Sequence, residues 1–253
     1  MIPISAAIIT YNEEENIERT VKSLDFCDEV VIVDSGSSDH TVELCTQLQC
    51  KIIHRPFDNF GLQKRFAVEQ TKNDWVLVID ADEVITAELK KEIVSHFSDK
   101  EVLVQGFYLP RTLVFLDHIF LSSGQHKQPY LRLFNKKFGT FNFHPLHAGV
   151  ELNGTTASLK HLLLHYSYHS LEDYLNKFNR YTTIAARHLV EQGKKNSKLK
   201  TVLRFPLTFI KIYLLKAGFM DGYAGLMWTL LSSMYPVIKY AKFLEYDELN
   251  KAS

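Results

Sequence analysis

Two aspartates separated by one small residue could together hold a metal ion: Asp80 and Asp82 flank Ala81. They follow an apolar run, residues 75–79, and so stand at the end of a predicted buried strand. If the chain bends at Ala81, both carboxylates face one point, where a divalent cation relieves their mutual repulsion. Such a cation would offset the charge of a departing diphosphate. The alternative is that one aspartate caps the next helix while the other is solvated.

Three other predicted strands also end in polar residues. In an open parallel sheet, ligands bind beyond the carboxyl ends of the strands. A single polar turn is weak evidence, but four at one edge of a sheet indicate a binding site. The sequence has no glycine-rich phosphate loop of the P-loop or dinucleotide-binding type. The four turns are residues 10–14, 34–39, 54–56 and 80–83.

The elements that must position these turns can be read from hydrophobic patterning. Apolar rather than alternating strands, separated by amphipathic helices, predict a parallel sheet covered on both faces. Asn12 is expected to cap the first helix, with Glu15 at its third position. The predicted strands are residues 4–9, 29–33, 51–54 and 75–79, and the predicted helices include residues 62–71 and 86–98.

The second half of the chain has a different pattern. Strand-like segments between residues 102 and 168 predict mixed or antiparallel additions to the sheet. Ser170 is expected to cap a long helix, and two further helices follow to about residue 243, with Pro206 breaking or beginning one of them. The sequence therefore predicts an α/β domain in residues 1–168 and a helical region in residues 169–253.

Composition excludes several classes of protein. The 253 residues are 46% hydrophobic and 23% charged, which is typical of a globular protein. Lysine plus arginine and aspartate plus glutamate both number 29, so no overall basic field would attract nucleic acid. Cys27, Cys45 and Cys50 lack metal-ligand spacing and indicate a reducing compartment. The N-terminus lacks the pattern of a signal peptide, so we expect a cytoplasmic protein.

Basic and apolar residues alternate near the C-terminus. Residues 193–218 contain seven basic residues and no acidic one, a composition typical of a helix on an anionic membrane surface. The charge-free residues 222–238 are short for a membrane span and include Pro236, which favours peripheral association over insertion. A helical bundle packed on the α/β domain, or a homodimer contact, is the alternative.

The turn sequences together resemble those of family 2 glycosyltransferases of the GT-A fold. The similar segments are residues 9–14, 33–41 and 78–83. Later segments resemble a bacterial branch related to lipopolysaccharide core β-1,4-glucosyltransferases: residues 128–134, 144–147, 164–168 and 216–222. The resemblance implies a Rossmann-like, mostly parallel sheet and transfer of a sugar, glucose, from a UDP-sugar to a cell-envelope glycan or glycolipid. It also implies Mg²⁺ or Mn²⁺ as cofactor.

The resemblance implies roles for individual residues. The nucleoside would contact the turn from Thr10 through Tyr11, Asn12 and Glu14, together with Asp34 and Ser37. Lys64 would approach the diphosphate or base, and Arg132 would hold phosphate or acceptor unless it is a buried ion-pair partner. Asp80 would touch ribose or metal beside Ala81, Asp82 would ligate the metal, and a third ligand would be His147 or His165. His161 and His165 are expected to share one face of a strand.

The proton acceptor is less well defined. Inverting transfer needs a base for the acceptor hydroxyl, and related members carry Val-His-Glu where this chain has Leu146, His147 and Ala148. Glu151, Asp82, Glu83 or His147 could serve instead, although a strand-surface position also accounts for Glu151. The missing glutamate leaves open a nucleotide-sugar-binding partner without turnover. A nucleotidyltransferase is disfavoured because a basic triphosphate loop is absent.

Overall fold

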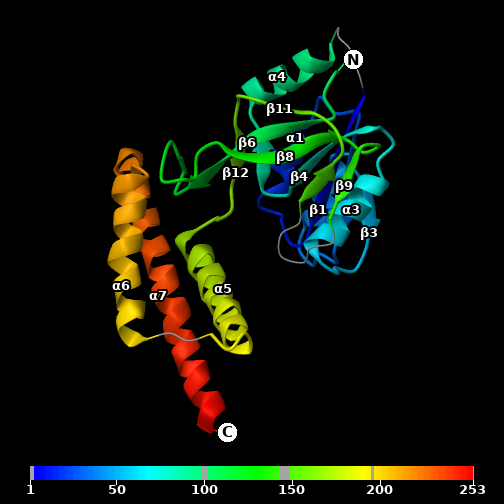
Figure 1. Ribbon diagram of the computed structural model, residues 1–253. Helices are drawn as coiled ribbons and strands as arrows, with labels where there is room; N and C mark the ends of the chain where they lie inside the picture. Colours follow the sequence, from blue (N-terminus) through cyan, green and yellow to red (C-terminus); the bar gives the residue numbers. More distant parts are fainter. Residues whose placement is uncertain (1–2, 99–101, 143–148, 195–196, 253) are drawn as a thin grey trace. The chain divides into compact units, whose positions relative to one another are not determined.

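The computed structural model describes residues 3–98, 102–142, 149–194 and 197–252 (Figure 1). The chain divides into two compact units. The first comprises Met1–Leu113 and Lys127–Tyr166, and the second comprises Val114–His126 and Ser167–Ser253. The first unit contains the α/β sheet, and the second contains the long C-terminal helices.

Four neighbouring parallel strands form one half of the central sheet, in the spatial order β3-β2-β1-β4. Because β1 lies between β2 and β4, the chain order reverses beside β1, and their carboxyl ends meet at one edge. This is the arrangement at which open α/β sheets bind ligands. The strands are β1 Ile4–Thr10, β2 Glu29–Asp34, β3 Lys51–His54 and β4 Trp75–Asp80.

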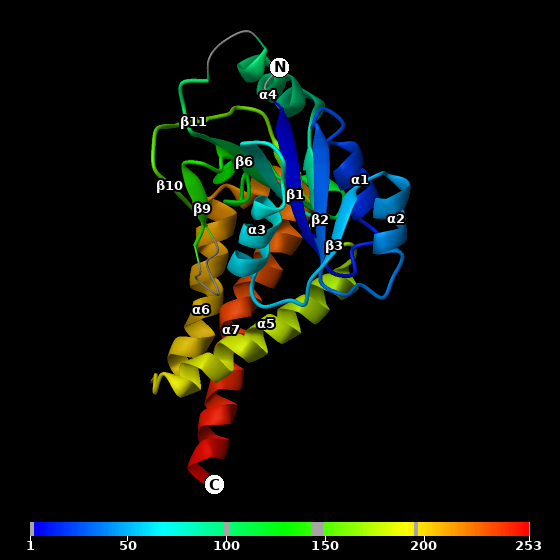
Figure 2. The ribbon, with the colours of Figure 1, turned by 90° about the vertical axis from the view of Figure 1, so that its right-hand side faces the viewer.

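Helices cover both faces of these strands, as the apolar strand sequences predict. Within β1, Ala6 and Ile8 belong to one hydrophobic cluster, and Ala7 between them belongs to another. The first cluster includes residues of α1, α2 and α4, and the second includes Ala67 of α3. Figure 2 shows α3 on one side of the strands and α1 and α2 on the other. The helices are α1 Ile17–Lys22, α2 Thr41–Gln47, α3 Phe60–Glu69 and α4 Ala87–Phe97.

Mixed and antiparallel strands extend the sheet, as predicted, and their order is β4-β8-β6-β12-β5. Strand β8 is antiparallel to β4 and β6, whereas β12 is parallel to β6 and antiparallel to β5. The bounds are β5 Glu83–Ile85, β6 Gly106–Phe115, β8 Gln128–Asn135 and β12 Leu163–His165. Strand β11, Thr156–Ser158, pairs with β6, while β9, Gly139–Phe141, and β10, Val150–Leu152, form a separate pair.

The second unit is mainly helical. Its elements are β7 His118–Ile119, α5 Leu171–Glu191, α6 Lys198–Ile210, the π-helical η1 Lys211–Leu215, the 3₁₀ turn η2 Gly218–Asp221 and α7 Gly222–Ala252. Aromatic rings surround Trp228 of α7: those of Phe115, Phe120, Tyr168 and Tyr174. No helix among the described residues combines the length and apolarity needed to cross a bilayer.

Two predictions about helix ends had different outcomes. Ser170 caps α5, where its hydroxyl accepts a 3.0 Å hydrogen bond from the Asp173 amide, as predicted. Pro206 lies inside α6, so the prediction that it breaks or begins a helix was wrong. A proline ring frees the carbonyl four residues earlier, and that residue, Val202, is exposed. Water can therefore satisfy the freed carbonyl.

Candidate active site

The turns that follow β1 and β2 hold each other in place. The Asn12 amide donates to Ser37 Oγ at 2.9 Å, and the Ser38 amide donates to Asn12 Oδ1 at 2.8 Å. Asn12 has a φ of 53°, a backbone region that asparagine adopts more readily than most residues. The prediction that Asn12 caps the first helix was wrong, because its side chain binds the neighbouring turn and α1 begins only at Ile17.

Carboxylates of these turns are occupied by the turns themselves. Buried Asp34 accepts hydrogen bonds from the Gly36 amide at 2.9 Å and from Ser37 Oγ at 2.5 Å. Glu14 accepts one from the His40 amide at 2.9 Å and lies 2.8 Å from the His40 ring. The hydrogen bonds from the His40 amide and ring lower the pKa of Glu14, and the ring contact with the Glu14 carboxylate raises the pKa of His40. These side chains therefore preform the binding edge.

Thr10, the last residue of β1, and Tyr11, which follows it, are the next candidates for contact with a ligand. Thr10 is buried, and its hydroxyl has no hydrogen-bond partner among the described residues. Tyr11 is 59% exposed although it is a large aromatic residue. Thr10 is paired with Asp34 of β2, and the preceding Ile9 is paired with Asp80 of β4, so all three strand ends lie side by side.

A chain of alternating side-chain charges links Lys64 of α3 to Arg111 of β6, by way of Asp80, Arg132 and Glu83. Lys64 Nζ lies 2.5 Å from Asp80 Oδ1, and Arg132 lies 2.5 Å from Asp80 Oδ2. Burial raises the pKa of the Asp80 carboxyl, but the positive charges of Arg132 and Lys64 outweigh this effect and hold the pKa far below its usual range. Asp80 is therefore ionised, with each carboxylate oxygen bound to a fixed cation.

Glu83 continues this chain and fixes two arginines. Its side chain is fully buried and accepts from Arg132 at 2.7 Å, from Arg111 at 3.4 Å and from the Asp80 amide at 3.0 Å. Buried charges are stable only when they are paired and hydrogen-bonded in this way. Glu83 thus positions its neighbours, which argues against a role as proton acceptor.

Asp82 has a different partner from Asp80. The chain turns at Ala81 and Asp82, and the Ala81 carbonyl accepts a 2.7 Å hydrogen bond from Thr20. Asp82 Oδ2 lies 3.2 Å from His165 Nε2, and both side chains are partly accessible. Burial raises the pKa of Asp82, but the hydrogen bond and charge of His165 outweigh it and lower the pKa overall. Pairing of β12 with β5 brings His165 to this turn.

The Asp82–His165 pair fits a Mg²⁺ or Mn²⁺ ion that is also bound by substrate. It combines a carboxylate oxygen, the ligand that Mg²⁺ and Mn²⁺ prefer, with an imidazole nitrogen, a ligand typical of transition-metal ions. The described residues contain no cluster of three or more candidate ligands. Of the described residues, Asp82 and His165 would be the ones to hold such an ion, and Mg²⁺ sites commonly complete their coordination with substrate phosphate oxygens and water.

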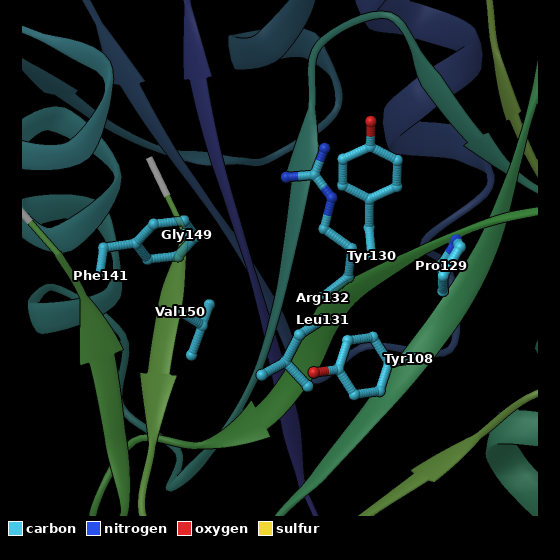
Figure 3. Close-up of a pocket in the computed structure, with 8 residues that line it drawn as sticks. All are labelled: Tyr108, Pro129, Tyr130, Leu131, Arg132, Phe141, Gly149 and Val150. Atoms are coloured by element: carbon cyan, nitrogen blue, oxygen red, sulfur yellow. The ribbon is translucent and has the colours of Figure 1, made fainter. Parts of the chain in front are cut away.

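A pocket of about 220 Å³ lies beside Arg132 (Figure 3). Figure 3 shows Arg132 and Tyr130 pointing the same way from β8. The Arg132 Nε has no hydrogen-bond partner among the described residues, and Arg111 stacks on the Tyr130 ring at 3.8 Å. The pocket is lined by Tyr108, Pro129, Tyr130, Leu131, Arg132, Phe141, Gly149 and Val150. Aromatic rings with a buried cation suit a polar ring-shaped ligand such as a sugar.

Other predicted site residues lie elsewhere. Glu151 is exposed on β10, where it pairs with Thr140. His147 and Ala148 lie outside the described residues. His161 precedes β12 and contacts Glu92 of α4 at 2.9 Å, so the prediction that it shares a strand face with His165 was wrong. Its ring and amide are held by that carboxylate.

Sequence reasoning missed Arg111, Tyr130 and Tyr108. The signal for Arg111 was a charge inside an otherwise apolar strand, β6, where an unpaired guanidinium would be costly. Tyr108 and Tyr130 gave no comparable signal, because tyrosine is common in half-buried strands.

Comparisons with known proteins bear on the family and the fold. The model for the family described as "Glycosyl transferase family 2" matches residues 5–149. An uncharacterised glycosyltransferase of Rickettsia typhi is 33% identical over 97% of this chain and 88% of its own length. The lipopolysaccharide core biosynthesis glycosyltransferase LpsC of Rhizobium meliloti is 27% identical over 98% and 94%. The structure of S. aureus TarS 1-349 in complex with UDP is 16% identical, covers 97% of this chain and 89% of that one, and has a TM-score of 0.50.

Proposed function

The chain belongs to glycosyl transferase family 2, and we propose that it transfers a sugar, glucose, from a UDP-sugar to a cell-envelope glycan such as the lipopolysaccharide core. The name of LpsC supports that acceptor, and the UDP complex of TarS, which has a similar fold, supports the nucleotide. A lipid-linked acceptor would place the enzyme at the inner face of the cytoplasmic membrane.

The observation that supports this proposal is that the two aspartates at the end of β4 have different partners. Asp80 holds Lys64 and Arg132, whereas Asp82 faces His165. We assign Asp82 and His165 as ligands of Mg²⁺ or Mn²⁺, and Asp80 as the residue that fixes two cations. A bound metal ion would supply positive charge to the departing diphosphate.

The remaining residues would bind the two substrates. Thr10 and Tyr11 would contact the nucleoside at the edge that Asn12, Glu14, Asp34 and Ser37 preform. Lys64 and Arg132 present positive charge on the side where the diphosphate would lie. The pocket beside Arg132 would receive a sugar ring of the acceptor, whose hydroxyl attacks the anomeric carbon with inversion.

We propose that the proton acceptor is one of Asp82, Glu151 and His147. Glu83 is excluded from this set because its carboxylate is buried and binds two arginines. The variants Asp82→Asn, Glu151→Gln and His147→Asn separate the three. Loss of the base lowers kcat while UDP affinity is retained, whereas loss of a metal ligand lowers both.

Calorimetric titration with UDP, with and without Mn²⁺, tests the donor site. We expect saturable binding that Mn²⁺ strengthens, and loss of that strengthening in Asp82→Ala. The matched control is Asp74→Ala, which changes an exposed aspartate just before the other end of β4. Absence of UDP binding both with and without metal would contradict the proposal.

The residue at position 148 motivates a second candidate, a UDP-sugar-binding partner without turnover. The family resemblance implies a glutamate at the position where this chain has Ala148. This candidate predicts UDP-sugar binding with no hydrolysis and no transfer. Measurable hydrolysis or transfer that collapses in Asp82→Ala would rule it out.

A further inference from the structure

Helix α6 and the adjoining η1 carry a line of exposed apolar side chains, which we call the α6 stripe. Its members recur every three or four residues, so they lie along one side of the helix. They are Leu199, Leu203, Leu207, Ile210 and Leu214, with exposed fractions between 46% and 70%. Contiguous exposed apolar patches on a folded protein mark interaction surfaces.

The second unit does not use this stripe to hold α6 in place. Figure 1 shows α6 on one side of α7 and α5 on the other, and α6 contacts α7. Within α6 itself, Thr201 is the buried residue, and Arg204 packs its guanidinium over the Tyr240 ring of α7 at 3.7 Å. The stripe is therefore apolar surface beyond what the described packing of this helix requires.

The charges that accompany the stripe have one sign. Residues 193–218 contain seven basic residues and no acidic one. Lys198, Lys200 and Lys211 are exposed, and in the part of the chain that the structure describes they form no ion pair. Exposed leucines beside unneutralised lysines are complementary to a bilayer surface, where acyl chains lie beneath anionic phosphates.

We propose that the α6 stripe docks on an anionic membrane surface, with its leucines in the headgroup region and these lysines on lipid phosphates. A second copy of the chain is a poorer occupant, because a two-fold contact places the same patch, and the same lysines, against each other. This inference deepens the membrane placement in the proposed function by naming the surface that makes the contact, and it holds whichever donor and acceptor the enzyme uses.

Vesicle flotation of the full chain tests the proposal. The probes are vesicles of phosphatidylcholine alone and of phosphatidylcholine with a minor share of phosphatidylglycerol. We expect binding to the anionic vesicles only, weakened by salt. Replacing Lys198, Lys200 and Lys211 by glutamine should lower the partition coefficient roughly five-fold per lysine. The variant Leu203→Glu with Leu207→Glu should abolish flotation at low and high salt.

Leu103→Glu is the matched control, because Leu103 is 78% exposed but belongs to the first unit. It should float like the original chain. Thermal unfolding and UDP titration accompany each variant, so that loss of folding or of donor binding is separated from loss of membrane contact. The proposal is overturned by equal flotation of the stripe and control variants. It is also overturned by a dimer in light scattering that the stripe variant dissociates.

Discussion

Replacing Arg132 by methionine should destabilise the first unit far more than the same change at a surface arginine. Arg132 is 5% exposed and binds Asp80 at 2.5 Å and Glu83 at 2.7 Å. Its loss leaves fully buried Glu83 with only the longer Arg111 contact among the ion pairs described. Removing one partner of a buried ion pair costs about 3–5 kcal/mol, because the other charge stays buried.

Arg65→Met is the matched control, since Arg65 pairs with Glu69 one helical turn away on the surface of α3. Such a pair contributes about 0.3–0.5 kcal/mol. Urea unfolding can be followed by Trp75 fluorescence in a Trp228→Phe background, because the chain has two tryptophans and Trp75 lies in β4. A cost for Arg132→Met within about 1 kcal/mol of the control, at unchanged m-value, would refute the buried charge chain.

Three further changes probe other parts of the chain. Gly61→Ala should lower the melting temperature, because its Cβ would lie 2.4 Å from the Asn142 carbonyl oxygen, and backbone shifts of this kind cost about 1–3 kcal/mol. Asp221→Asn should cost most at pH 7. Burial raises the pKa of the Asp221 carboxyl, but its hydrogen bonds outweigh burial and lower the pKa overall. The carboxylate therefore stabilises the fold above the unfolded pKa of about 3.9, and this stabilisation disappears as pH falls through the lower folded pKa. Thermal unfolding of both proteins at pH 7 and at a pH below the folded pKa checks this. Burial raises the pKa of Cys27 to about 12, so iodoacetamide at pH 8 should label it more slowly than Cys50, whose pKa is lowered by its hydrogen bond with Cys45.

Local pattern was sufficient to predict the parallel half of the sheet. The runs that became β1, β2 and β4 are apolar over their length, and each ends in a polar residue within one position of the predicted end. Buried strands and their cover helices follow from hydrophobic period alone. The boundary between the domains at residue 168, and the roles of the site residues, stay predictions.

Elements defined by distant pairing could not be predicted. Strand β5 has three residues and begins directly after Asp82, so it has no periodic pattern of its own. It becomes a strand because β12 pairs with it from about 80 residues away. The same pairing brings His165, one of the two histidines predicted as a third metal ligand, beside Asp82. The sequence likewise predicted Asn12 as a helix cap, because the hydrogen bond from the Ser38 amide to its side chain joins residues that are distant in the sequence.

The spacing of Asp80 and Asp82 indicates two carboxylates at one point, but their neighbours give them different properties. Asp80 has a cation on each oxygen, so a metal ion there would compete with Lys64 and Arg132 for the same lone pairs. Asp82 faces a histidine, which can bind a metal through its ring nitrogen without leaving a buried charge unpaired. Because Arg132 also lines the pocket, Asp80 would act through Arg132, by fixing the cation that an incoming phosphate or acceptor would meet. Converting Asp80 to asparagine should therefore alter substrate affinity while leaving the Asp82–His165 pair in place.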